Sequence, residues 1–257
     1  AARKADRCVG SQDATREAAE PANGNQCGAE KIEEGAGSSY MKNELERQTE
    51  LQKLYLRNMQ LIKWRLRSIS DIREGKTKTT YKITNIEFCV LQIRKILELI
   101  ALSALVSDAD LYREKLGNID RMWNARLILK DIERIHPNFY PEPIYVDPQN
   151  RFQWKPRKES YLTKDEFIAA YNRCGKFLHE DSPFMSNKEI DSAYEQIWDD
   201  VYRWGQLIIN LLYTHAVRLY NEKDLFYIAM GDELERPHGN IFTKVEGEDS
   251  PDGSHEI

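Results

Sequence analysis

The chain has 257 residues, of which 41% are hydrophobic and 31% are charged, and its formal net charge is −5. This balance is typical of one large or two small globular domains with solvated helices. No apolar run reaches the roughly 18 residues of a membrane span, and no apolar segment of a secretory signal follows the polar first residues. We therefore expect a soluble cytoplasmic protein that makes no contact with a membrane.

The net charge conceals a basic segment. Residues 41–82 carry eleven basic and five acidic side chains, whereas residues 246–257 carry five acidic side chains and no Lys or Arg. An anionic partner is therefore compatible with the acidic chain. A solvated helix face explains the same charges without any partner.

The sequence contains no recognisable metal-binding pattern. Its four cysteines form no Cys-x-x-Cys pair, which indicates free thiols in a reducing compartment. The residues His179, Glu180, Asp181 and His215 contain no His-Glu-x-x-His spacing either. We expect neither a metal nor another cofactor.

Both ends of the chain lack large apolar side chains. Residues 1–38 and the acidic residues 247–257 cannot bury enough surface to offset the entropy of ordering, so both are predicted to be disordered. Between them, apolar residues at helical spacing predict five helices. These cover about residues 41–73, 84–106, 119–135, 163–179 and 188–221.

Local signals define two of these helices. Thr84 with Glu87, and Thr163 with Glu166, match the capping box at the starts of the second and fourth helices. The second helix is apolar almost all round, so it should be the central one. His215 falls on the apolar face of the last helix and is interpreted as a core histidine.

Short strands are predicted in two places. Residues 137–161 hold five prolines and predict a long irregular insertion, with a short hairpin across Ile144–Val146 and Arg151–Trp154. The stretches Leu225–Met230 and Asn240–Val245 are expected to pair as a second hairpin.

The predicted fold is all-α: an up-and-down bundle of about five helices over residues 39–224, followed by a small C-terminal β-hairpin at residues 225–246. The alternative is a coiled-coil dimer through the first and last helices.

One segment could carry chemistry. Arg173 and His179 are separated by five residues near a predicted helix end, and Arg94 and Glu98 lie one turn apart on the apolar second helix. Over roughly residues 85–220 this pattern resembles the HEPN superfamily. The family's motif is an Arg, four to six intervening residues and a His near the end of a late bundle helix. An acidic residue on an earlier helix often supports it.

The resemblance implies metal-independent RNA cleavage across a homodimer interface, in a toxin–antitoxin or phage-defence system with an antitoxin as a further partner. The candidate catalytic residues are then Arg173, His179, Glu98 and Arg94. A histidine can move the proton of a 2′-hydroxyl near neutral pH, and an arginine can hold the phosphate. The alternative is a non-catalytic helical scaffold that mediates protein–protein interaction or dimerisation, in which Arg173 pairs with Glu98 and His179 caps its helix.

A second candidate lies in the proline-rich insertion. Residues 151–158 interleave basic and aromatic side chains, a pattern that suits phosphates and stacked bases. The candidate RNA-binding residues are Arg151, Trp154, Lys155, Arg157 and Lys158. In the alternative, Phe152 and Trp154 only anchor the loop to the bundle.

Overall fold

A computed structural model describes residues 33–146, 154–179, 182, 184–221, 223–232 and 234–243. The chain divides into two compact units, residues 1–43 and 44–257. Of the first unit the structure describes only residues 33–43, which are helical, and residues 33–38 of these belong to the segment predicted to be disordered. The predictions for residues 1–32 and 247–257 lie outside the described residues. All contacts discussed below lie within the second unit.

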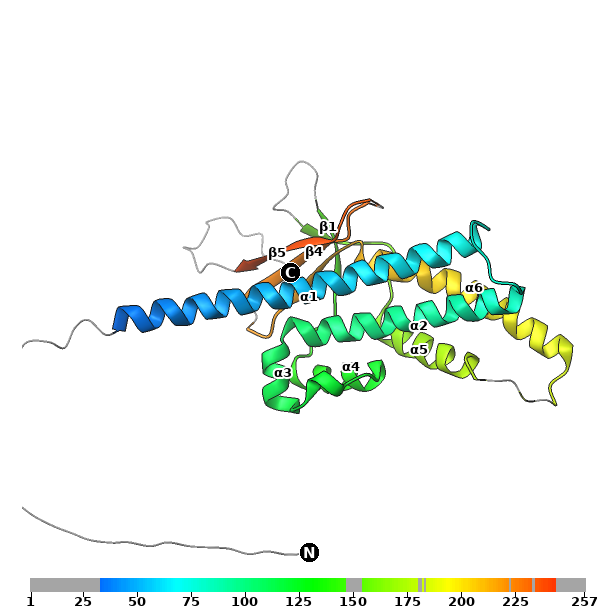
Figure 1. Cartoon of the computed structure of the whole chain (residues 1–257), viewed down its shortest axis with the longest axis horizontal. Coiled ribbons are helices and arrows are strands. Elements are labelled where there is room, and N and C mark those ends of the chain that lie inside the picture. Colours follow the sequence, from blue (N-terminus) through cyan, green and yellow to red (C-terminus); the bar gives the residue numbers. More distant parts are fainter. Residues whose placement is uncertain are drawn as a thin grey trace, which may run out of the picture. The chain divides into compact units, whose positions relative to one another are not determined.

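Six α-helices are present in the described residues (Figure 1). They are α1 (Glu33–Arg73), α2 (Lys82–Ser107), α3 (Ala109–Leu116), α4 (Ala125–Ile135), α5 (Lys164–Phe177) and α6 (Asn187–Leu212), with a 3₁₀ turn at Ile119–Arg121. None of these described helices has both the length and the apolar character needed to cross a membrane.

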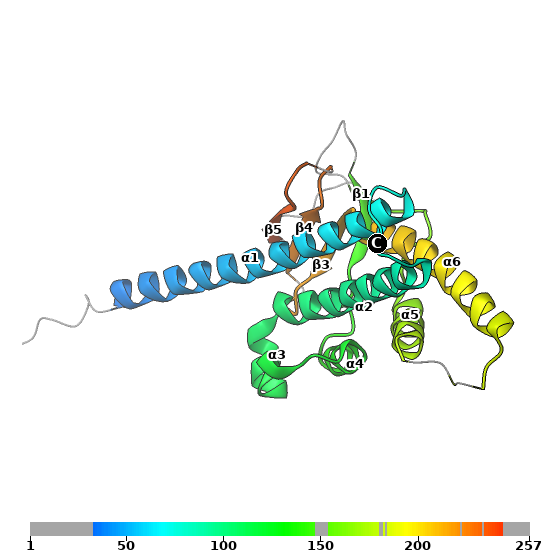
Figure 2. The same ribbon diagram turned by 45° about the vertical axis from the view of Figure 1, so that its right-hand side comes forward.

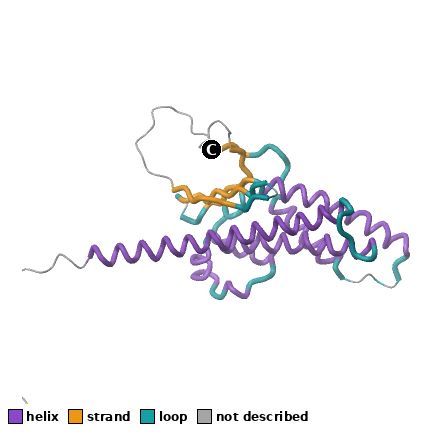
Figure 3. Tube along the Cα trace, turned by 45° about the horizontal axis from the view of Figure 1, so that its top comes forward, coloured by secondary structure: helices purple, strands orange, loops and turns teal. Residues whose placement is uncertain are grey.

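In the part of the chain that the structure describes, five strands form one antiparallel sheet in the order β2-β1-β3-β4-β5. They are β1 (Glu142–Val146), β2 (Trp154–Pro156), β3 (Thr214–Arg218), β4 (Asp224–Ala229) and β5 (His238–Thr243). Figure 3 shows the strands gathered beside the helices. The predicted pairing of the two C-terminal stretches is confirmed in β4 and β5, where Phe226 lies opposite Ile241. In the proline-rich insertion, β1 pairs with β2 (Trp154–Pro156), and Trp154 lies opposite Val146. Residues 151–153 of the predicted hairpin lie outside the described residues.

The prediction of an all-α fold is wrong, because a five-stranded sheet accompanies the helices. Two of its strands precede α5 in the chain, and three follow α6. The helical spacing of Leu211, His215 and Leu219 predicts a helix through residue 221, but α6 ends at Leu212. Residues 214–218 instead form the central strand β3, which pairs with β1 on one side and β4 on the other. Pairing on both edges outweighs the helical spacing, and the β-branched Thr214 and Val217 favour a strand.

The third predicted helix, about residues 119–135, is shorter in the structure, where residues 119–121 form a 3₁₀ turn and α4 begins at Ala125. Residues 109–116 form α3, which the sequence pattern missed, and Gly117 then turns the chain with a φ of 79°. A φ in this region favours glycine, so the helix ends here. The next helix, α4, begins only after Asn124, whose side-chain oxygen accepts a hydrogen bond from the Leu127 N–H at 3.2 Å.

The central position of α2 is confirmed. It contacts α3, α4, α5 and α6, and Figure 2 shows it between α1 and the α3–α5 helices. The predicted capping box of α2 is wrong, because the helix begins at Lys82 and the Thr84 hydroxyl donates to the Tyr81 carbonyl at 2.9 Å. Glu87 instead accepts a hydrogen bond from the Tyr194 hydroxyl of α6 at 2.9 Å. The side chain that local sequence suggests as a cap therefore joins two helices.

A buried hydrogen bond joins α1 to the sheet. The Tyr55 hydroxyl lies 2.9 Å from Nε2 of His215 on β3, and the Tyr55 ring meets Phe226 of β4 edge-on at a centroid distance of 5.2 Å. His215 is fully buried, which confirms its interpretation as a core histidine, although it lies on a strand. Further along α1, the Lys63 ammonium donates to the backbone carbonyl of Met230 at 3.0 Å.

Candidate functional site

The segment that carries the Arg-x5-His motif is α5. Thr163 caps its first turn and forms the predicted capping box with Glu166, which confirms the local prediction. The helix ends at Phe177, and the Leu178 N–H bonds back to the Cys174 carbonyl at 3.1 Å. His179 follows directly, with its backbone N–H 3.3 Å from the Lys176 carbonyl. After α5 ends, these two hydrogen bonds therefore hold the chain in a tight turn as far as His179.

One face of α5 receives Arg94 of α2. The Arg94 guanidinium lies 4.4 Å from the Tyr171 ring centroid, and its Nη2 donates to the Tyr171 hydroxyl at 3.2 Å. A Cβ atom added at Gly175 would meet Arg94 Nη1 at 2.6 Å. Glycine at this position therefore lets the guanidinium lie against the α5 backbone.

Glu98 holds Arg94 from its own helix. One Glu98 oxygen lies 3.5 Å from Arg94 Nε, and the other accepts from the Lys95 ammonium at 2.8 Å. The Glu98 and Arg94 side chains are 16% and 23% exposed, so the pair is largely covered but still reaches the surface. This cluster contains one more cation than carboxylate, which leaves it capable of attracting an anion.

Arg173 lies on a different side of α5. Its Nε is 2.5 Å from Oδ2 of Asp200 on α6, and Arg203 approaches the same carboxylate at 3.7 Å. The expected pairing of Arg173 with Glu98 is therefore replaced by one with Asp200. Positions 173 and 175 are about 200° apart on a helix, so Arg173 and Arg94 flank α5 from opposite sides. An open depression around Arg173 is lined by a second arginine, Arg203, and by the carboxylates of Asp199 and Asp200. Its formal charges therefore balance, and the Arg173 guanidinium is already engaged by Asp200.

His179 is exposed at the end of α5. Its side chain forms no hydrogen bond or ion pair with the residues that the structure describes. His179 follows Gly175, against which Arg94 lies, by four positions, but it lies beyond Phe177, the last residue of α5. Helical spacing therefore does not fix the side on which the imidazole lies, and the structure gives it no contact with Arg94 or Arg173.

Cys174, which follows Arg173 on α5, points into the core. The side chain is fully buried, and burial raises the pKa of its thiol to about 12. A thiol in this state is a poor nucleophile and a poor metal ligand. Cys174 therefore serves as a small packing residue.

The candidate residues of the proline-rich insertion are only partly available. Trp154 stacks on Tyr227 of β4 at a centroid distance of 5.9 Å and meets Phe242 of β5 at 5.4 Å. Arg157 donates from Nε to the Ile144 carbonyl at 3.3 Å. Lys155 and Lys158 are exposed, and Arg151 lies outside the described residues. The contacts of Trp154 are those of an anchor for the β1–β2 hairpin.

A buried polar cluster escaped the sequence analysis. Nδ1 of His136, at the end of α4, lies 3.5 Å from Oδ2 of Asp108, between α2 and α3. Neither atom has a hydrogen-bond partner among the described residues, nor does the nearby Tyr112 hydroxyl of α3. Burial raises the pKa of Asp108, while the Tyr220 N–H and His136 act in the opposite direction. In the sequence, only the predicted ends of the second and third helices, near residues 106 and 135, lie close to these positions.

No cluster of three or more His, Cys, Asp or Glu side chains suited to a metal occurs in the described part of the chain. Comparisons with protein-family models, with curated proteins and with solved structures returned no match. The functional argument consequently depends on the residues themselves.

Proposed function

We propose that the protein is a HEPN-like RNA-cleaving protein whose working pair is Arg94 and His179 at the end of α5. The observation that supports this proposal is the contact of the Arg94 guanidinium with Gly175, one helical turn before the exposed His179. Glu98 acts as a positioning residue because it holds Arg94 Nε. Arg173, held by Asp200, has at most a secondary part in this arrangement.

RNA cleavage at the end of α5 would need one group that binds the phosphate and one that accepts a proton. A guanidinium offers a planar fork of N–H donors that matches two phosphate oxygens and stabilises the charge that develops on them. An imidazole takes the proton of the 2′-hydroxyl as that oxygen attacks the adjacent phosphorus and the 5′-oxygen leaves. The single-stranded RNA substrate, the homodimer and the cytoplasmic setting belong to the same proposal.

Cleavage of a fluorescent single-stranded RNA by the full chain in EDTA tests this proposal. His179→Ala should lower the rate by about 10²–10⁴-fold, the usual contribution of a proton-transfer group. Arg94→Ala should lower it by about 10²–10³-fold through lost stabilisation of the phosphate charge. Arg173→Ala should have a much smaller effect, and the matched control is Asn172→Ala, an exposed neutral residue on the same helix.

Two results would contradict the proposal. If His179→Ala, shown to be folded by circular dichroism, cleaves at the wild-type rate, the site is not at the end of α5. If Arg173→Ala abolishes cleavage and Arg94→Ala does not, the guanidinium assignment is wrong. A wild-type chain that neither cleaves nor binds RNA would favour the non-catalytic scaffold.

A further inference from the structure

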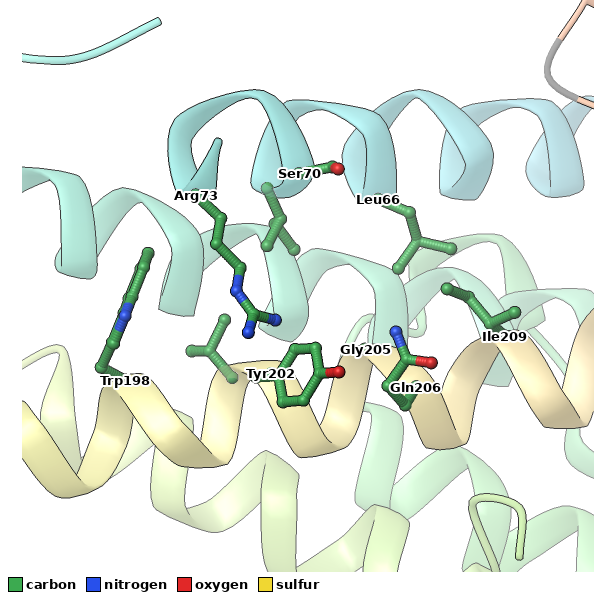
Figure 4. Close-up of a pocket in the computed structure, with 10 residues that line it drawn as sticks. Leu66, Ser70, Arg73, Trp198, Tyr202, Gly205, Gln206 and Ile209 are labelled. Atoms are coloured by element: carbon green, nitrogen blue, oxygen red, sulfur yellow. The ribbon is translucent and has the colours of Figure 1, made fainter. Parts of the chain in front are cut away.

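A groove runs between α1 and α6, away from the α5 site (Figure 4). Its apolar lining comes from Leu66 and Ile69 of α1 and from Val201 and Ile209 of α6. The volume is about 110 Å³. A second chamber of about 250 Å³ shares Leu66 and Ile209 with the first and continues to Met230. The two chambers also share Ser70, so they adjoin each other between α1 and α6.

Arg73 provides a cation at one end of this groove. Figure 4 shows its side chain reaching from α1 toward α6, near Trp198 and Tyr202. The guanidinium carbon lies 3.4 Å from the Tyr202 ring centroid. No carboxylate of the described residues pairs with Arg73, and no Asp or Glu lines either chamber. By contrast, Arg67 on the same helix forms an ion pair with Asp71 at 2.8 Å.

Gly205 keeps the groove open at its middle. A Cβ atom added there would meet nothing within 4 Å, so close packing does not require glycine at this position. Glycine inside a helix costs about 1 kcal/mol relative to alanine. Gly205 therefore weakens α6, and its missing side chain leaves empty space in the lining of the groove.

We propose that the groove binds an amphiphilic carboxylate with a single acyl chain. The carboxylate pairs with Arg73, because the guanidinium fork matches a carboxylate in geometry and charge. The chain lies over Leu66 and Ile209 and extends toward the second chamber. From Arg73 to Lys63 the groove follows α1 for about 15 Å, at 1.5 Å per residue. The inference is independent of the proposed RNA cleavage, which uses other residues.

Isothermal titration of the full chain with decanoate, below its micelle concentration, tests the proposal. Arg73→Gln should weaken binding by about tenfold or more, because a charge-assisted contact is lost. Gly205→Leu should abolish measurable binding by filling the groove, and Gly205→Ala should weaken it less. Arg57→Gln on the same helix lies outside both chambers and serves as the charge-matched control.

The chain-length series provides a second criterion. From hexanoate to octanoate to decanoate, each added methylene should tighten binding by about two- to fourfold, as expected for burial of a methylene group. Decanol, which lacks the charge, should bind more weakly than decanoate. The proposal is overturned if decanoate does not bind, if decanol binds equally well, or if folded Arg73→Gln and Gly205→Leu bind as the wild type does.

Discussion

Replacing Tyr55 by Phe should reveal how strongly α1 is held to the sheet. Nδ1 of His215 lies 2.9 Å from the Leu212 carbonyl. A carbonyl only accepts hydrogen bonds, so Nδ1 carries the proton and Nε2 accepts the hydroxyl of Tyr55 at 2.9 Å. Both side chains are almost completely buried. Tyr55→Phe therefore removes one donor and leaves a buried acceptor without a partner.

The loss expected for Tyr55→Phe is about 1–3 kcal/mol, the cost of an unsatisfied buried polar group. Urea unfolding at pH 7 measures it as a lower midpoint with an unchanged m value. A second variant, Tyr55→Phe with His215→Leu, should lose less than the sum of the two single changes because no buried acceptor is left unpaired on the ring. A Tyr55→Phe midpoint equal to that of the wild type would refute this reading of the hydrogen bond.

Burial of His215 should also make the free energy of unfolding depend on pH. Burial lowers the pKa of His215 to about 4, against about 6.5 for a histidine in an unfolded chain. Between these two values the unfolded chain binds a proton that the folded chain does not, so the free energy of unfolding falls as the pH falls. At 1.36 kcal/mol per pKa unit, His215 contributes a loss of about 3 kcal/mol between pH 7 and pH 4. His215→Leu should lack this part of the acid dependence, and an identical acid slope in that variant would rule out His215 as its source.

Three further substitutions should change stability in known directions, each read as a shift of the thermal midpoint by circular dichroism. Gly205→Ala should stabilise by about 0.5–1 kcal/mol because an open helical position gains a better helix former, and a lower midpoint would show that the position is crowded. Thr163→Ala should cost about 0.5–2 kcal/mol by removing the α5 cap, so an unchanged midpoint would contradict the capping box. Gly239→Ala should cost about 1–3 kcal/mol through overpacking, since its Cβ would lie 2.4 Å from the Tyr227 backbone oxygen; a tolerated alanine there would mean that β4 and β5 separate easily.

Much of the local structure was determined by the sequence itself. The start of α5 follows from Thr163 and Glu166, which satisfy the free N–H groups of the first turn through their own side chains. The β4–β5 hairpin follows from two short apolar stretches close in the chain. The central position of α2 follows from its apolar character on all sides. In each case the decisive residues are near neighbours in sequence, or one helix carries the whole signal.

Tertiary structure decided the rest. Residues 214–218 are spaced as a helix would be, yet they pair on both edges as β3 because β1 and β4 supply their main-chain partners. Arg173 could have paired with any carboxylate that folding brought near it, and its partner is Asp200 of α6 rather than Glu98. The resemblance to the HEPN superfamily and the RNA cleavage that it implies remain predictions. The periodicity of the sequence indicates which residues can share one face of a helix or strand. Which strand or carboxylate a residue then pairs with depends on elements that are distant in the chain.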